Sequence, residues 1–192
     1  MGKQGLYSNK EDSMRNKRTY IIGTMVIIVL LVGLFSFRTY KSTDEQEVEN
    51  TITEFFSAFY TVTPDTIDVM MPNQGVFNYE SFAKSTYDGL YTQTFYKTFL
   101  VGDRYMIMAP QIASDNELTI SFKGIKLTAI ESNDKDKYYD FTVEIVVKDN
   151  VSGTEEILVN KGQVRVKQDF FKYKLHAIKF FEDKLVRYLY EK

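Results

Sequence analysis

The side chains that could carry chemistry are few, and they form no recognisable catalytic set. The chain has one histidine, His176, and no cysteine. A thiol nucleophile, a disulfide, a Cys-ligated zinc, an iron–sulfur cluster and a site with several histidine ligands are therefore excluded. His176 falls among alternating residues of a predicted strand, without a serine-rich turn or a second histidine. This context favours a structural or solvent-facing histidine over a catalytic one.

Carboxylates are the remaining candidates for acid–base chemistry. Asp65, Asp68, Asp88 and Asp103 all fall at predicted helix starts or turns, where aspartate commonly caps the backbone. A carboxylate at the mouth of an aromatic cavity can act as a general base, but no spacing selects one of these four. The segment 133–136 lacks the glycine and the terminal glutamate of a calcium loop, so we interpret it as a solvated hairpin turn. We therefore predict that the protein is not an enzyme and has no metal or cofactor.

A basic stripe is predicted on the last two strands. Arg165, Lys167, Lys172 and Lys174 alternate with apolar residues, which places them on the outer face of a sheet. The alternatives are a solvated face and a site for nucleic acid or anionic lipid. Residues 38–192 carry 19 basic and 24 acidic groups, a formal charge of −5, so the solvated face is preferred and no direct nucleic-acid binding is expected. We keep the four residues as a candidate contact surface.

An apolar segment must fix the position of the domain that holds these residues. Tyr20 to Phe37 reads YIIGTMVIIVLLVGLFSF, 18 residues without a charge or a proline. As a helix it would reach about 27 Å, close to the hydrocarbon thickness of a bilayer. A core helix of a soluble protein would normally show a polar stripe, and this segment has none. It is also longer than the apolar part of a signal peptide and lacks a small-x-small cleavage site. The segment is thus predicted to be an uncleaved transmembrane helix.

The charges beside this segment predict its orientation. Arg15, Lys17 and Arg18 precede it, whereas the basic residues after it are soon followed by acidic ones. The positive-inside rule then places the N-terminus in the cytoplasm, and Tyr20 and Phe37 take the place of interfacial aromatic anchors. We predict a single-pass protein of the cell membrane with three parts: a cytoplasmic tail over 1–19, a transmembrane helix over 20–37 and an extracytoplasmic domain over 38–192.

Helices are predicted in the first half of that domain. A capping box at 42–45 opens a helix whose apolar residues recur on one face up to Phe59. Pro64 begins a short second helix that carries Ile67, Met70 and Met71. Pro72–Gly75 forms a turn. A third helix is predicted from about Tyr79 to Leu90, followed by another short one before Gly102.

Strands are predicted in the second half. From Tyr105 onward the period changes to two, and Gly124 shifts its phase as a β-bulge would. Four strands joined by short polar turns form an antiparallel meander. The fold class is therefore α+β, with about three helices packed on one face of a curved four-stranded antiparallel sheet. Residues 183–192 form either a last helix or an amphipathic tail.

This order of elements over residues 15–181 resembles that of VirB8-like proteins. They are bitopic assembly factors of type IV secretion and conjugation machines, and their outer domain has the NTF2-like cone fold. The Asn-Pro-x-Gly signature of many Gram-negative members is missing, and Pro72-Asn73-Gln74-Gly75 does not replace it. Lysine outnumbers arginine 18 to 6. Both features agree with versions from Gram-positive conjugative elements.

The resemblance implies a non-enzymatic scaffold subunit that contacts membrane lipid, other channel subunits and copies of itself. Confinement near one plane raises the effective concentration of its partners, so that individually weak contacts suffice. One alternative is an enzyme or small-ligand binder, which needs an open cavity with a convergent Asp/Tyr pair. Another is a surface sensor or accessory module. The chain also has 14 Tyr and 15 Phe, which predict a core filled by rings or exposed Tyr patches for protein contacts.

Overall fold

The computed structural model describes residues 44–70, 78–133 and 135–190. The predicted cytoplasmic tail, the apolar segment 20–37 and the turn at Pro72–Gly75 lie outside these residues. Within the described part of the chain, no helix is both long and apolar enough to span a bilayer. One compact unit runs from Glu47 to Lys192.

Helices form the first half of this unit, as predicted. The first helix covers residues 44–59 and buries Phe55, Phe56 and Phe59 on one face. Gly89 adopts a left-handed φ of 76°, and the third predicted helix already ends before it, at Tyr87. The helices after the first are α2 (Thr66–Met70), α3 (Tyr79–Tyr87), α4 (Gln93–Phe95), the π-helix η1 (Tyr96–Gly102) and α5 (Tyr105–Asp115).

The prediction of a strand period from Tyr105 onward was wrong for the first eleven residues, which form α5. Met106, Ala109, Pro110 and Ala113 are buried at helical spacing. Pro110 removes one backbone hydrogen bond of the helix, and the burial of its apolar neighbours offsets that loss. The described residues consequently contain more helices than the roughly three that the pattern predicted.

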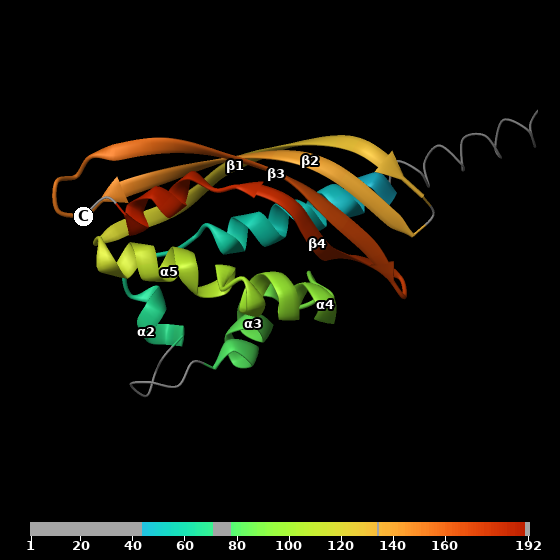
Figure 1. The fold of residues 1–192 in the computed structure, drawn as a ribbon, viewed down its shortest axis with the longest axis horizontal. Helices are drawn as coiled ribbons and strands as arrows, with labels where there is room; N and C mark the ends of the chain where they lie inside the picture. Colours follow the sequence, from blue (N-terminus) through green and yellow to red (C-terminus); the bar gives the residue numbers. More distant parts are fainter. Residues whose placement is uncertain (1–43, 71–77, 134, 191–192) are drawn as a thin grey trace, which may run out of the picture. The chain divides into compact units, whose positions relative to one another are not determined.

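A four-stranded antiparallel sheet with the strand order β1-β2-β3-β4 covers the helices, and its curvature is visible in Figure 1. The register shifts between Phe122 and Gly124, which confirms the predicted bulge. The strands are β1 (Leu118–Ser132), β2 (Asp136–Asp149), β3 (Glu155–Asp169) and β4 (Lys172–Glu182). The α+β class and the meander are thus confirmed. The chain then enters the 3-10 helix η2 (Lys184–Leu189), so the C-terminal segment is a short helix rather than a tail.

Aromatic rings fill the space between the helices and the inner face of the sheet. Phe56 of the first helix lies 4.5 Å from Phe141 of β2 between ring centroids, and Phe99 stacks on Tyr105 at 4.4 Å. Phe181 of β4 contacts the same cluster. Burial of one such ring stabilises the fold by roughly 2–3 kcal/mol. The ring-filled core therefore explains much of the high aromatic content.

Short segments cover both edges of the sheet. Ile120 of β1 exchanges two backbone hydrogen bonds with Val62, at 2.8 and 2.9 Å. Leu175 of β4 accepts from the Thr92 amide at 2.9 Å and donates to the Leu90 carbonyl at 2.9 Å. Each of these contacts is an isolated bridge that pairs the edge strand at one point.

Candidate interaction surface

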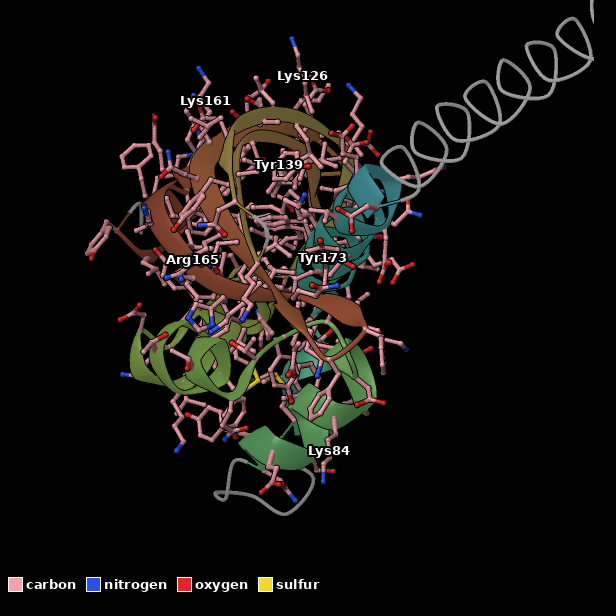
Figure 2. The ribbon with its side chains drawn as sticks, turned by 90° about the vertical axis from the view of Figure 1, so that its right-hand side faces the viewer. Lys84, Lys126, Tyr139, Lys161, Arg165 and Tyr173 are labelled. Atoms are coloured by element: carbon pink, nitrogen blue, oxygen red, sulfur yellow. The ribbon has the colours of Figure 1, made fainter. Side chains whose placement is uncertain are left out.

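The four predicted basic residues lie on one face of the β3–β4 hairpin. In the register, Lys167 lies opposite Lys174, and Lys172 lies opposite Asp169. Residues opposite each other in an antiparallel pair project to the same side, as do residues i and i+2 of one strand. The residues between them, such as Val166 and Leu175, are buried on the inner side. Tyr139 and Tyr173 mark that inner side in Figure 2, and Lys126 and Lys161 point away from it.

Acidic side chains neutralise part of this stripe. Arg165 donates from Nε and Nη2 to the two carboxylate oxygens of Asp136, at 3.1 and 2.9 Å. This bidentate hydrogen bonding holds the pKa of the Asp136 carboxyl below its usual range. Lys174 pairs with Asp169 at 2.7 Å. The Arg165 pair has no local sequence signal, because Asp136 comes from the neighbouring strand, 29 positions away.

A hollow of about 340 Å³ opens on the outer face beside this pair. Tyr138 is one of its lining residues, and two cations approach the Tyr138 ring. The ring centroid is 4.4 Å from the Lys179 ammonium and 5.8 Å from the Arg165 guanidinium carbon, both within the range of a cation–π contact. The residues that line the hollow come from all four strands and one turn: Ile130, Asn133, Tyr138, Gln163 and Lys179.

Two β-bulges direct side chains to the hollow. The register of β1 shifts between Ala129 and Glu131, so Ile130 is an extra residue without a partner across the ladder. On β4, Ile178 and Phe180 face consecutive residues of β3, so Lys179 is likewise an extra residue. A bulge redirects the side chain that it inserts. The sequence carried no signal for either bulge, because neither involves a glycine.

His176 is the extra residue of a third bulge. It lies on β4 between Leu175 and Ala177, which pair with the consecutive β3 residues Val166 and Arg165. Its Nδ1 lies 3.1 Å from the Thr92 hydroxyl, which also accepts a hydrogen bond from the Phe95 amide at the start of α4. Burial lowers the pKa of His176, and the charges of Arg165 and Lys167 lower it further. A neutral imidazole that ties β4 to α4 fits the predicted structural role.

A buried polar cluster joins Tyr60, directly after the first helix, to the C-terminal end of the domain. Asn160 of β3 is fully buried and donates from Nδ2 to the hydroxyl of Tyr60 at 2.8 Å. Its Oδ1 accepts from the backbone amide of Lys184 at 2.9 Å. The first carboxylate oxygen of Asp183 accepts from the Leu185 amide at 3.0 Å. Asn160 is a polar residue at a position of β3 where the alternating pattern places a buried side chain. This was the one sequence signal for the cluster.

Asp183 and Tyr60 are the carboxylate–phenol pair that the enzyme hypothesis requires. Burial raises the pKa of Asp183 to about 6, and burial together with Asp183 raises that of Tyr60. The Tyr60 hydroxyl lowers the pKa of the Asp183 carboxyl, against the larger effect of burial. Oδ2 of Asp183 is buried and has no hydrogen-bond partner among the described residues.

The surroundings of this pair are a packed core. The Tyr60 ring centroid lies 4.8 Å from that of Phe59 and 6.3 Å from that of Phe56. Neither the hollow at Tyr138 nor a second one of about 290 Å³, between α5 and η2, is lined by Tyr60 or Asp183. The outer face is therefore the better candidate for a functional surface.

Arg15, Lys17, Arg18, Tyr20 and Phe37, the predicted topology and anchor residues, lie outside the described part of the chain. Their roles stay predictions.

Comparison with known proteins assigns no family. No family model matches the chain, and no curated protein matches its sequence. Among solved structures, the intermembrane space region of the chloroplast protein ARC6 is similar to 62% of this chain, and the match covers 97% of that region, with a TM-score of 0.33 and 12% identity. A likeness at this level carries no argument about function.

Proposed function

We propose that this protein is a membrane-anchored, non-enzymatic assembly subunit of a conjugative type IV secretion channel, with an extracytoplasmic domain of the VirB8-like, NTF2-like kind. Its predicted single anchor, the basic residues before that anchor and the order of helices followed by a four-stranded antiparallel sheet support the proposal. The NTF2-like assignment rests on this element order and on helices that cover one face of a curved sheet.

The hollow at Tyr138 is the observation that carries the proposal. Its lining joins the ring of Tyr138, the ammonium of Lys179 and an amide side chain, Gln163, on the outer face of the sheet, and Arg165 contacts the same ring. Tyrosine and arginine are enriched at protein interfaces, because both combine a large contact area with polar groups that pair with a partner. The two cations at this ring favour a polar or acidic segment of another channel subunit.

The packed interior supports a non-enzymatic role. A ligand at the Tyr60–Asp183 pair would have to displace rings that are already in contact with each other. Such a displacement costs several kcal/mol, because cores are packed as densely as organic crystals. A role in assembly needs no such rearrangement of the core.

Co-purification from intact membranes tests the proposal. The full chain carrying Tyr138→Ala is compared with the wild type and with Tyr190→Ala, a matched control whose tyrosine is 81% exposed and does not line the hollow. We expect the wild type and the control to recover channel subunits, and Tyr138→Ala to recover about tenfold less or worse, because loss of a central interface aromatic costs roughly 2 kcal/mol. Equal recovery by both variants, or recovery of the wild type without any partner in mild detergent, would contradict the proposal.

A ligand-binding role is the second candidate, and the raised pKa of Asp183 favours it. A thermal-shift screen of small apolar ligands against the wild type and Asp183→Asn tests it. A ligand that stabilises the wild type but not the variant would favour this role. If no ligand does so, assembly stays the better account.

A further inference from the structure

Two neighbouring phenylalanines point into solvent at the turn between β3 and β4. Phe170 is 90% exposed and Phe171 is 92% exposed. Single apolar residues on a protein surface are common, but two adjacent, almost fully exposed rings are not. They make no contribution to the ring cluster of the core.

The backbone of this turn disfavours an aromatic residue as well. Phe170 adopts a φ of 57°, in the left-handed region where glycine is preferred because it has no Cβ. Asp169 pairs with Lys172, so the two phenylalanines form a two-residue hairpin turn, a position typical of glycine or asparagine. Neither local geometry nor core packing therefore explains these rings.

Exposed lysines lie at the same end of the sheet. Residues 135–137 and 165–174 together hold six basic and two acidic residues, and the first helix, which contacts β4 through Thr51, adds Glu47 and Glu49. The two segments meet where the Gln168 amide donates to the Lys135 carbonyl at 2.9 Å. Lys135 and Lys172 are both exposed. Exposed rings framed by lysines are the chemistry that an anionic lipid surface recognises.

The beginning of the domain lies beside this turn. The Thr51 hydroxyl, in the first helix, donates to the carbonyl of Tyr173 at 3.4 Å, and Tyr173 follows Phe171 by two residues. The predicted membrane span ends at Phe37, and residues 38–43 connect it to the first helix. A chain extends by at most about 3.5 Å per residue, so this connection can bridge no more than about 25 Å. The turn therefore lies beside the first helix, the element that follows the predicted span in the sequence.

We propose that the Phe170–Phe171 turn is a membrane contact, in which the two rings enter the headgroup region and the neighbouring lysines bind anionic lipid headgroups. This contact would fix the orientation of the domain relative to the bilayer. It goes beyond the proposed assembly function, because the Tyr138 hollow lies on the sheet face and the turn lies at the end of the hairpin.

Tryptophan fluorescence tests the membrane contact directly, because the chain has no tryptophan of its own. The full chain carrying Phe171→Trp is reconstituted into phosphatidylglycerol vesicles with brominated acyl chains. A matched control carries Val151→Trp, in the β2–β3 turn at the opposite end of the sheet, where Val151 is 76% exposed. We expect a blue-shifted and strongly quenched emission for Phe171→Trp, and an unshifted and unquenched one for Val151→Trp.

Charge variants and lipid-free samples complete the test. Lys135→Glu together with Lys172→Glu, added to Phe171→Trp, should reduce the quenching in phosphatidylglycerol vesicles. Emission from Phe171→Trp that matches the Val151→Trp control would overturn the proposal. A second outcome would also overturn it: a blue shift that grows with protein concentration in detergent, with no quenching by brominated lipid. That result would show that the turn contacts a second copy of the chain. Circular dichroism of each variant verifies its fold, and the result leaves the Tyr138 proposal untouched.

Discussion

The ammonium group of Lys179 lies 4.4 Å from the centre of the Tyr138 ring, although the two residues are separated by a whole strand of the sheet. Lys179 reaches this position because it is the extra residue of a bulge in β4. Arg165 approaches the same ring and is itself held by Asp136. The outer face of the sheet thus carries an ordered polar site, and its order comes from register rather than from any local motif.

Removal of the Tyr138 ring should affect binding far more than stability. The ring is half-buried on the outer face and is not part of the core cluster, so Tyr138→Ala should change the free energy of unfolding by about 1 kcal/mol, the value of a cation–π contact at the surface. Urea denaturation of the detergent-solubilised chain measures this change. A loss of several kcal/mol would show that Tyr138 belongs to the core and would remove the basis of the binding test.

Asp183 should make stability depend on pH between about 4 and 6. Its folded pKa of about 6 lies above the ordinary value of 3.8, so the fold disfavours the charged form. The stabilisation is complete below pH 3.8 and is lost as the pH rises through about 6. Asp183→Asn should therefore be more stable than the wild type at pH 8, by about 1–3 kcal/mol.

The measurement is the difference between the two unfolding curves at each pH. That difference should shrink toward pH 4, where the carboxyl of the wild type is protonated. Asparagine can still accept the hydrogen bond from the Leu185 amide, so the variant keeps the start of η2. Parallel pH profiles would contradict a buried, ionised Asp183.

Asn160 should be essential to the fold. Asn160→Ala leaves the Tyr60 hydroxyl and the Lys184 amide without their partner, and each unsatisfied buried group costs about 1–3 kcal/mol. Thermal unfolding should report a large loss of stability. Lys161→Ala, at the next residue and on the exposed side, is the control and should change stability by less than about 0.5 kcal/mol. Similar melting temperatures for the two variants would refute the role of Asn160.

Gly162 should tolerate no side chain. A Cβ at this position would overlap the carbonyl oxygen of Phe180 and the ring of Phe141. Gly162→Ala should destabilise the domain by about 1–3 kcal/mol, because the overlap forces backbone or ring to move. Gly124→Ala, where a Cβ meets no atom within 4 Å, is the matched control. Equal stability of the two variants would argue against the close β3–β4 packing at Phe180.

The turn at Phe170 should gain stability when its ring is removed. Phe170→Gly relieves a left-handed conformation that costs about 1–2 kcal/mol for a residue with a Cβ. Phe171 has no positive φ, so Phe171→Gly should bring no such gain. Chemical denaturation of both variants decides the point. If Phe170→Gly is more stable than the wild type and also loses membrane contact, the Phe170 ring lowers stability but is needed for binding.

Local periodicity predicted the first helix, the four strands and the bulge at Gly124, because each depends on residues that are close in sequence. It failed at α5, whose dense apolar content gives no clear period and whose interior contains Pro110. The site depends on distant pairs. Arg165 meets Asp136 across 29 positions, and Asn160 meets Tyr60 across 100, so only the strand register and the helix packing reveal them. The basic stripe was predictable, but the aspartates that neutralise part of it were not.

Photocrosslinking from position 138 in intact cells tests the central claim most directly. A photoreactive phenylalanine analogue replaces Tyr138 in the full chain, and the same analogue at position 190 serves as the control. The account predicts a specific crosslink from position 138 to another subunit of the secretion channel, and none from position 190. Absence of any protein crosslink at position 138, or the same products from both positions, would contradict it.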